Sequence, residues 1–92
     1  MKNLYGYDVL IERFLKNEIT ALQFQDQYLD KYFADRNPLG EELFFKLDWL
    51  FAEVECFTHL PIGPEDDPDF TINEDQLRHS AAKTLDEIRA LK

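Results

Sequence analysis

The stretch Pro38–Phe57, PLGEELFFKLDWLFAEVECF, decides the fold, because its apolar residues recur at helical spacing. Asn37 can cap a helix, and Pro38 suits the first helical position, where its missing N–H is not needed. At about 100° per residue, the main apolar set covers an arc of roughly 140° and is predicted to face a core. This set consists of Leu43, Phe44, Leu47, Leu50, Phe51, Val54 and Phe57.

The rest of this predicted helix mixes apolar and acidic residues. A second apolar strip consists of Phe45, Trp49, Ala52 and Cys56. The carboxylates around it are Glu41, Asp48 and Glu55, at seven-residue spacing, with Glu42 and Glu53 beyond them. Such a helix either lies centrally in a bundle or presents an acidic, apolar face to a partner. Trp49 is accordingly either half-buried by a neighbouring helix or exposed as an interface anchor.

Two further helices are predicted before this stretch. The first covers residues 7–16, with Tyr7, Leu10, Ile11, Phe14 and Leu15 on one face. The second begins at Thr20, where Gln23 completes a capping box, and fades near Asp35. Ile19 and Phe24 have the spacing of a hydrophobic staple across that start. The predicted buried face is Ala21, Phe24, Tyr28 and Tyr32, widened by Leu22, Leu29 and Phe33.

A fourth helix is predicted to begin at Asn73, with Gln76 in the capping-box position and Ile72 and Leu77 as its staple. Its buried stripe is Leu77, Ala81, Leu85, Ile88 and Leu91. Thr84 lies among these residues, where its hydroxyl can bond to a backbone carbonyl. Between the third and fourth helices, residues 58–71 hold three prolines, a glycine and four acids, which indicates a long irregular loop.

These elements predict an all-α protein: a small antiparallel four-helix bundle with a long acidic loop between the third and fourth helices. The 92 residues suffice for one small domain, and we expect residues 1–92 to form it. The start of the chain shows no signal-peptide pattern, and no apolar run is long enough to span a membrane. With a single cysteine, Cys56, the expected location is the cytoplasm.

The net charge of −9 is concentrated in one region. Residues 41–75 hold eleven acidic residues and one basic residue, Lys46. Such a local field repels nucleic acid and attracts a basic partner. The simpler alternative is an acidic surface that only aids solubility. No catalytic set, metal-ligand spacing, calcium-loop pattern or cofactor motif is found, so we expect no enzyme activity, no metal and no cofactor.

Four motifs resemble the bacterial self-protective immunity proteins of the colicin D type. They are FLKNEITALQF at 14–24, GEELF at 40–44, DPDFTI at 67–72 and NEDQL at 73–77. The resemblance extends from about Leu10 to Leu91. This family also includes immunity proteins paired with contact-dependent growth inhibition toxins. The resemblance implies a helical bundle without enzyme activity that forms a heterodimer with the C-terminal nuclease domain of a cognate toxin, which cleaves transfer RNA.

In such a complex, acidic side chains stand in for RNA phosphates in the basic cleft of the toxin. The charge pattern agrees, because a cleft that holds RNA carries Lys and Arg side chains. The expected toxin-binding residues are Glu53, Glu55, Asp66, Asp67 and Asp69, then Asp48 and Glu42, with Trp49 as an anchor. Two other functions stay open: immunity to a DNA-cleaving toxin, and a helical adaptor or dimerisation module that uses the Phe45–Trp49 strip.

Overall fold

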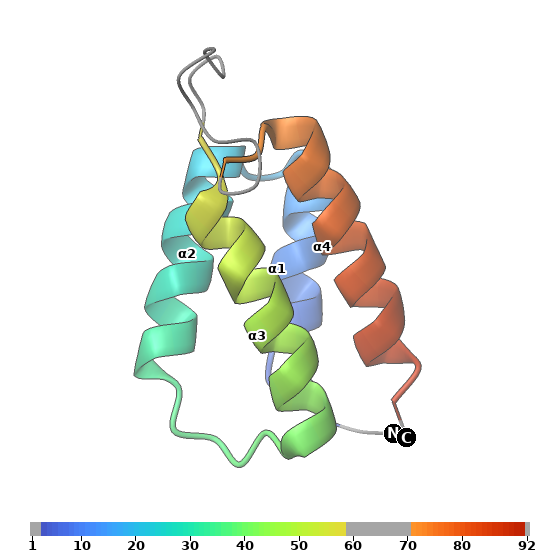
Figure 1. Cartoon of the computed structure of the whole chain (residues 1–92). Coiled ribbons are helices and arrows are strands. Elements are labelled where there is room, and N and C mark those ends of the chain that lie inside the picture. The colour runs from blue at the N-terminus through green and yellow to red at the C-terminus, as the bar shows by residue number, and fades with distance from the viewer. Residues whose placement is uncertain (1–2, 59–70, 92) are drawn as a thin grey trace.

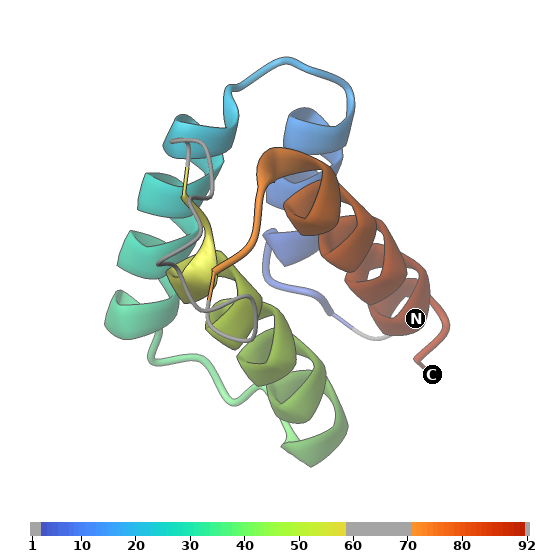
Figure 2. The same cartoon turned by 45° about the horizontal axis from the view of Figure 1, so that its top comes forward.

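The structure, a computed structural model, describes residues 3–58 and 71–91. These residues form four helices, α1 (Tyr7–Leu15), α2 (Ala21–Ala34), α3 (Glu41–Cys56) and α4 (Glu74–Arg89). Successive helices run in opposite directions, and α1 and α3 each pack against both α2 and α4 (Figure 1, Figure 2). No strand occurs within the described residues. The predicted all-α antiparallel bundle is confirmed.

Local chemistry sets the starts of α2 and α4. The Thr20 hydroxyl accepts the Gln23 N–H (3.1 Å), and the Gln23 side chain accepts the Thr20 N–H (2.8 Å). Asn73 and Gln76 exchange the same two bonds at the start of α4, each 2.9 Å long. Both capping boxes are as predicted, and the four staple residues Ile19, Phe24, Ile72 and Leu77 are buried.

The predicted start of α3 is wrong by three residues. Asn37 does not cap the helix: its N–H donates to Asp35 Oδ1 (2.7 Å), and its carbonyl accepts the Leu39 N–H (2.9 Å). These bonds fold residues 35–39 into a turn, which leaves Pro38 in the connection. The cap position is taken by Gly40, whose φ of 80° is available to glycine at little cost.

The centre of the bundle is a column of four fully buried aromatic residues from α1 and α2. The Phe14 and Phe24 rings stack with centroids 4.5 Å apart, and Tyr7 meets Tyr28 edge-on at 5.8 Å. The Tyr28 hydroxyl donates to the Leu47 carbonyl of α3 (2.7 Å), so this buried polar group is satisfied. Aliphatic residues of α3 and α4 close around the column.

The buried faces of α2 and α3 are narrower than predicted. Phe44 is 43% exposed, Leu22 42% and Phe33 65%. Periodicity places these side chains on the flanks of the apolar arcs, and each helix has neighbours on only part of its surface. In addition, α2 and α3 diverge toward the connection between them (Figure 1, Figure 2). Phe44, in the first turn of α3, therefore lacks a covering helix.

Two further contacts fix the ends of the connections between helices. The Tyr7 hydroxyl of α1 donates to Asp35 Oδ2 (2.6 Å), which ties the end of α2 to α1. An isolated parallel bridge joins Phe57 and Ile72, at the two ends of the long connection between α3 and α4. The predicted bond of Thr84 is wrong: its hydroxyl oxygen is buried without a hydrogen-bond partner in the described part of the chain.

Among the described residues, no helix has the length and apolar character that crossing a bilayer requires.

The Asn73 cap makes a measurable contribution to stability. We expect Asn73→Ala to lower the free energy of unfolding by about 1 kcal/mol, because the Gln76 N–H loses its acceptor. Asn73→Gly, which keeps the cap conformation accessible, should cost only a few tenths of a kcal/mol. Urea unfolding followed by circular dichroism measures both variants. An Asn73→Ala variant as stable as the parent chain would contradict this role.

The bond between Tyr7 and Asp35 predicts a pH-dependent stability. Partial burial raises the pKa of Asp35, but the Tyr7 and Asn37 hydrogen bonds outweigh it and hold the pKa below the ordinary value of 3.8. A carboxyl group whose pKa is lower in the folded state than in the unfolded state stabilises the fold at pH values above its unfolded-state pKa. This stabilisation is lost as the pH falls through the folded-state pKa. We expect Asp35→Asn to cost about 1 kcal/mol at pH 7.

The difference between Asp35→Asn and the parent chain should shrink as pH falls below 3.8. Tyr7→Phe, which keeps the packing of the ring, should give the same trend. Urea unfolding at a series of pH values measures it, and a difference that is equal at acid and neutral pH contradicts it.

Candidate functional site

The carboxylates of α3 have no cationic partner among residues 3–58 and 71–91. Within the described residues, none of its five acids lies within 4.0 Å of a basic nitrogen; they are Glu41, Glu42, Asp48, Glu53 and Glu55. The one base of α3, Lys46, pairs instead with Glu87 of α4 (3.0 Å). Acids elsewhere, such as Glu12 and Glu74, do have basic partners. Within the described residues, no salt bridge therefore neutralises the carboxylates of α3.

One flank of α3 forms a groove with α4. Trp49 and Glu53 line it from α3, opposite Asp75, His79 and Lys83 of α4, around a volume of about 670 Å³. Lys83 Nζ lies 4.8 Å from the centroid of the Trp49 ring, a cation–π contact. Trp49 remains 41% exposed, so α4 covers it only in part, and its role as an interface anchor stays a prediction. It is partly covered by α4, and the rest of its ring faces solvent.

Phe45 extends this apolar surface toward the start of α3. It is 59% exposed and lines a smaller pocket of about 270 Å³ that also includes Trp49 and Lys83. The second apolar strip predicted for this helix is thus largely accessible to solvent.

The other flank of α3 faces α2 and is aromatic. The Tyr32 and Phe51 rings stack at 4.5 Å, and Phe33 meets Phe51 edge-on at 5.2 Å. The Tyr32 hydroxyl donates to Asp48 Oδ1 (2.8 Å). Burial, and then this bond to a carboxylate, raise the pKa of Tyr32 to about 12, so the hydroxyl keeps its proton at neutral pH.

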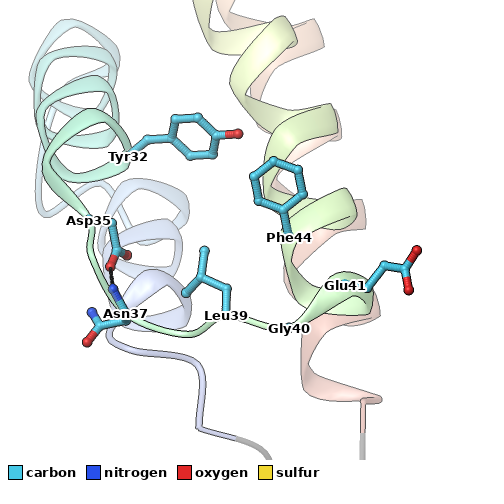
Figure 3. A pocket seen from close by; sticks show the side chains of 7 residues that line it. All are labelled: Tyr32, Asp35, Asn37, Leu39, Gly40, Glu41 and Phe44. Atoms are coloured by element: carbon cyan, nitrogen blue, oxygen red, sulfur yellow. Dashed lines mark hydrogen bonds between the residues drawn. The ribbon is translucent and has the colours of Figure 1, made fainter.

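A pocket of about 440 Å³ opens where α2 and α3 diverge (Figure 3). The side chains of Tyr32, Leu39 and Phe44 converge on it from α2, the connection and α3. Asp35 lies at its wall, and Glu41 extends from the start of α3 on the side away from Tyr32. The pocket thus combines apolar surface with the carboxylate of Asp35 at its wall.

The structure divides the predicted binding residues between the two flanks. It brings Trp49 and Glu53 together in the groove with α4, whereas Asp48 lies on the opposite flank, bonded to Tyr32. Glu42 and Glu55 are exposed and line none of the pockets described above. Asp66, Asp67 and Asp69, also predicted from the sequence, lie outside the described residues.

Sequence reasoning missed the α4 side of the groove. Asp75, His79 and Lys83 follow one another at four-residue spacing, which places them on a single flank of a helix. That spacing was visible in the sequence, but which helix this flank meets depends on how the bundle closes. The aromatic side of the α2–α3 pocket was missed because Tyr32 and Phe44 were both assigned to the core.

The described residues contain no group of three His, Cys, Asp or Glu side chains that could hold a metal ion.

The comparisons with known proteins place the chain in a family. No curated protein and no solved structure matches it. A family described as bacterial self-protective colicin-like immunity matches residues 3–88, nearly the whole chain. The chain therefore belongs to this family and is an immunity protein, whose partner is a toxin.

Proposed function

We propose that this immunity protein binds the C-terminal nuclease domain of a toxin that cleaves transfer RNA, and blocks its active site as a heterodimer. The observation that supports this most is the set of five α3 carboxylates without cationic partners in the described residues. In the proposed complex they occupy positions that RNA phosphates take in the toxin cleft.

The chemistry of an RNA-cleaving site supports such mimicry. A cleft that binds RNA carries Lys and Arg side chains, because most of the binding energy comes from the phosphates. A carboxylate can take the place of a phosphate oxygen, with a bidentate hydrogen bond when the partner is Arg. A surface with unpaired carboxylates gains these bonds without first breaking internal salt bridges.

The proposed binding surface comprises α3 and both of its flanks. Glu53 and Trp49 provide a carboxylate beside an exposed indole, the type of residue that often anchors interfaces. Glu42, Asp48 and Glu55 add charge along the helix. Asp66, Asp67 and Asp69 join them as a proposal from the sequence alone.

Electrostatic steering fits the task of an immunity protein. Opposite fields raise association rate constants toward about 10⁸ M⁻¹s⁻¹ at low salt. The toxin acts on RNA in the cytoplasm, so a cytoplasmic inhibitor must capture it before many molecules are cut. Fast association is thus as useful here as slow dissociation.

The direct test uses a toxin domain identified by its co-purification with this chain. The purified domain is incubated with total transfer RNA and, separately, with duplex DNA, with and without an equimolar amount of the immunity protein. We expect cleavage of transfer RNA alone, and its loss when the immunity protein is present. Cleavage of DNA instead would favour immunity to a DNase, and unimpeded RNA cleavage would reject the proposal.

Charge reversal on α3 should weaken the complex. We expect the double variant Glu53→Lys, Glu55→Lys to bind the toxin domain at least about tenfold more weakly, chiefly through slower association. The matched control reverses two exposed acids of α2, Asp26→Lys and Asp30→Lys, with the same change in net charge. Surface plasmon resonance at several salt concentrations measures both.

For the parent chain, the association rate constant should fall as salt is added, because salt screens the exposed charges. An equal loss of affinity in the α3 and α2 variants would show that only net charge matters, and would contradict a binding surface on α3. Thermal unfolding of both variants checks that the fold is kept.

A further inference from the structure

The pocket between the end of α2 and the start of α3 has a composition that carboxylate mimicry alone does not explain. Three apolar side chains, those of Tyr32, Leu39 and Phe44, converge on a volume of about 440 Å³ (Figure 3). The Tyr32 and Phe44 ring centroids lie 6.4 Å apart, with 26° between the ring planes. This accessible aromatic surface can receive a flat or elongated side chain of a partner.

The charged residues that line the pocket are acidic, although the positive charge of Lys31 also acts on Asp35 from outside the lining. Its lining includes Asp35, whose carboxylate lies at the wall, and Glu41, whose side chain extends away from Tyr32 (Figure 3). No basic residue lines it; Arg36, the next residue after Asp35, is not part of it. The Tyr32 hydroxyl on its aromatic side is bonded to a third carboxylate, that of Asp48. The C-terminal end of α2 and the N-terminal end of α3 both border this pocket, so their dipoles oppose each other and the acidic side chains set its charge.

Asp35 retains capacity for another donor. One of its oxygens accepts the Tyr7 hydroxyl. The other accepts the Asn37 N–H (Figure 3). A carboxylate has about four lone-pair sites, so two donors leave acceptor positions free. The same two bonds hold the carboxylate in one orientation at the wall of the pocket.

Aromatic rings together with carboxylates favour a guanidinium group. Its planar face stacks on aromatic rings, while its edge donates several hydrogen bonds to carboxylates. An ammonium group lacks the planar face, and a phosphate is repelled by the acids. We propose that this pocket binds an arginine side chain presented by the toxin, and so acts as an anchor beside the α3 carboxylates. The identity of the partner rests on the proposed function, whereas the preference for arginine rests on the pocket itself.

The preference for arginine is tested without the toxin. The ¹⁵N-labelled full chain is titrated with N-acetyl-arginine methylamide, followed by nuclear magnetic resonance. Matched titrations use the citrulline derivative, which has the shape of arginine without its charge, and the lysine derivative. We expect saturable shifts at Leu39, Gly40 and Phe44 with arginine, weaker shifts with lysine and none with citrulline. Equal shifts with citrulline, or shifts spread over all acidic surfaces, would overturn the proposal.

A matched pair of variants tests the role of the aromatic ring. Phe44→Ala removes one ring of the pocket, and Phe45→Ala makes the same change at the next residue of α3, which lines a different pocket. We expect Phe44→Ala to weaken binding of the arginine derivative about three- to fivefold, and Phe45→Ala to leave it unchanged. Phe44 is 43% exposed and Phe45 59%, and neither belongs to the buried core, so both variants should fold.

The same pair measured against the toxin domain separates this proposal from the proposed function. If the chain blocks the nuclease and Phe44→Ala binds it more weakly than the parent chain, both proposals are supported. If the chain blocks the nuclease while Phe44→Ala binds as tightly as the parent chain, the arginine anchor is rejected and the proposed function stands. If arginine binds in the pocket but the nuclease is not blocked, the proposed function fails. The pocket then still binds arginine, but the toxin is not the protein that presents it.

Discussion

The aromatic column of Tyr7, Phe14, Phe24 and Tyr28 is the constraint on which the rest of this structure depends. It fills the interior between α1 and α2, and the bond from the Tyr28 hydroxyl to the Leu47 carbonyl fixes α3 against it. A chain of 92 residues can enclose only a small core. Further large aromatic residues therefore remain at the surface, and they gather along both flanks of α3.

The sequence predicts the parts of the fold that depend on local bonds, and it predicts less well the parts that depend on packing between helices. Helix starts at Thr20 and Asn73 follow from bonds between residues three apart, so local sequence determines them. The start of α3 depends on a competition: Asn37 could cap the helix, but the turn with Asp35 and the backbone freedom of Gly40 prevail. Periodicity also cannot tell how wide a buried face is, because that width depends on how many neighbours a helix has.

The sequence predicts the negative charge of the candidate site but not how its side chains are arranged. Composition alone identifies the acidic excess around α3, and the structure shows that these acids lack basic partners among the described residues. That Trp49 lies against Lys83, and that Asp48 is bonded to Tyr32, depends on the rotation of each helix about its axis. Such rotations are set by packing across the whole bundle, which no single stretch of sequence encodes.

The parallel bridge between Phe57 and Ile72 has a consequence for how much the connection between α3 and α4 can vary. Its backbone bonds, from the Ile72 N–H to the Cys56 carbonyl and from the Thr58 N–H to the Ile72 carbonyl, hold the two ends of a connection side by side. Backbone bonds of this kind do not depend on which side chains lie between them. Doubling the length of a closed segment costs only about 0.6 kcal/mol of entropy. Insertions and substitutions between the two ends can thus be accommodated at little cost to the helices.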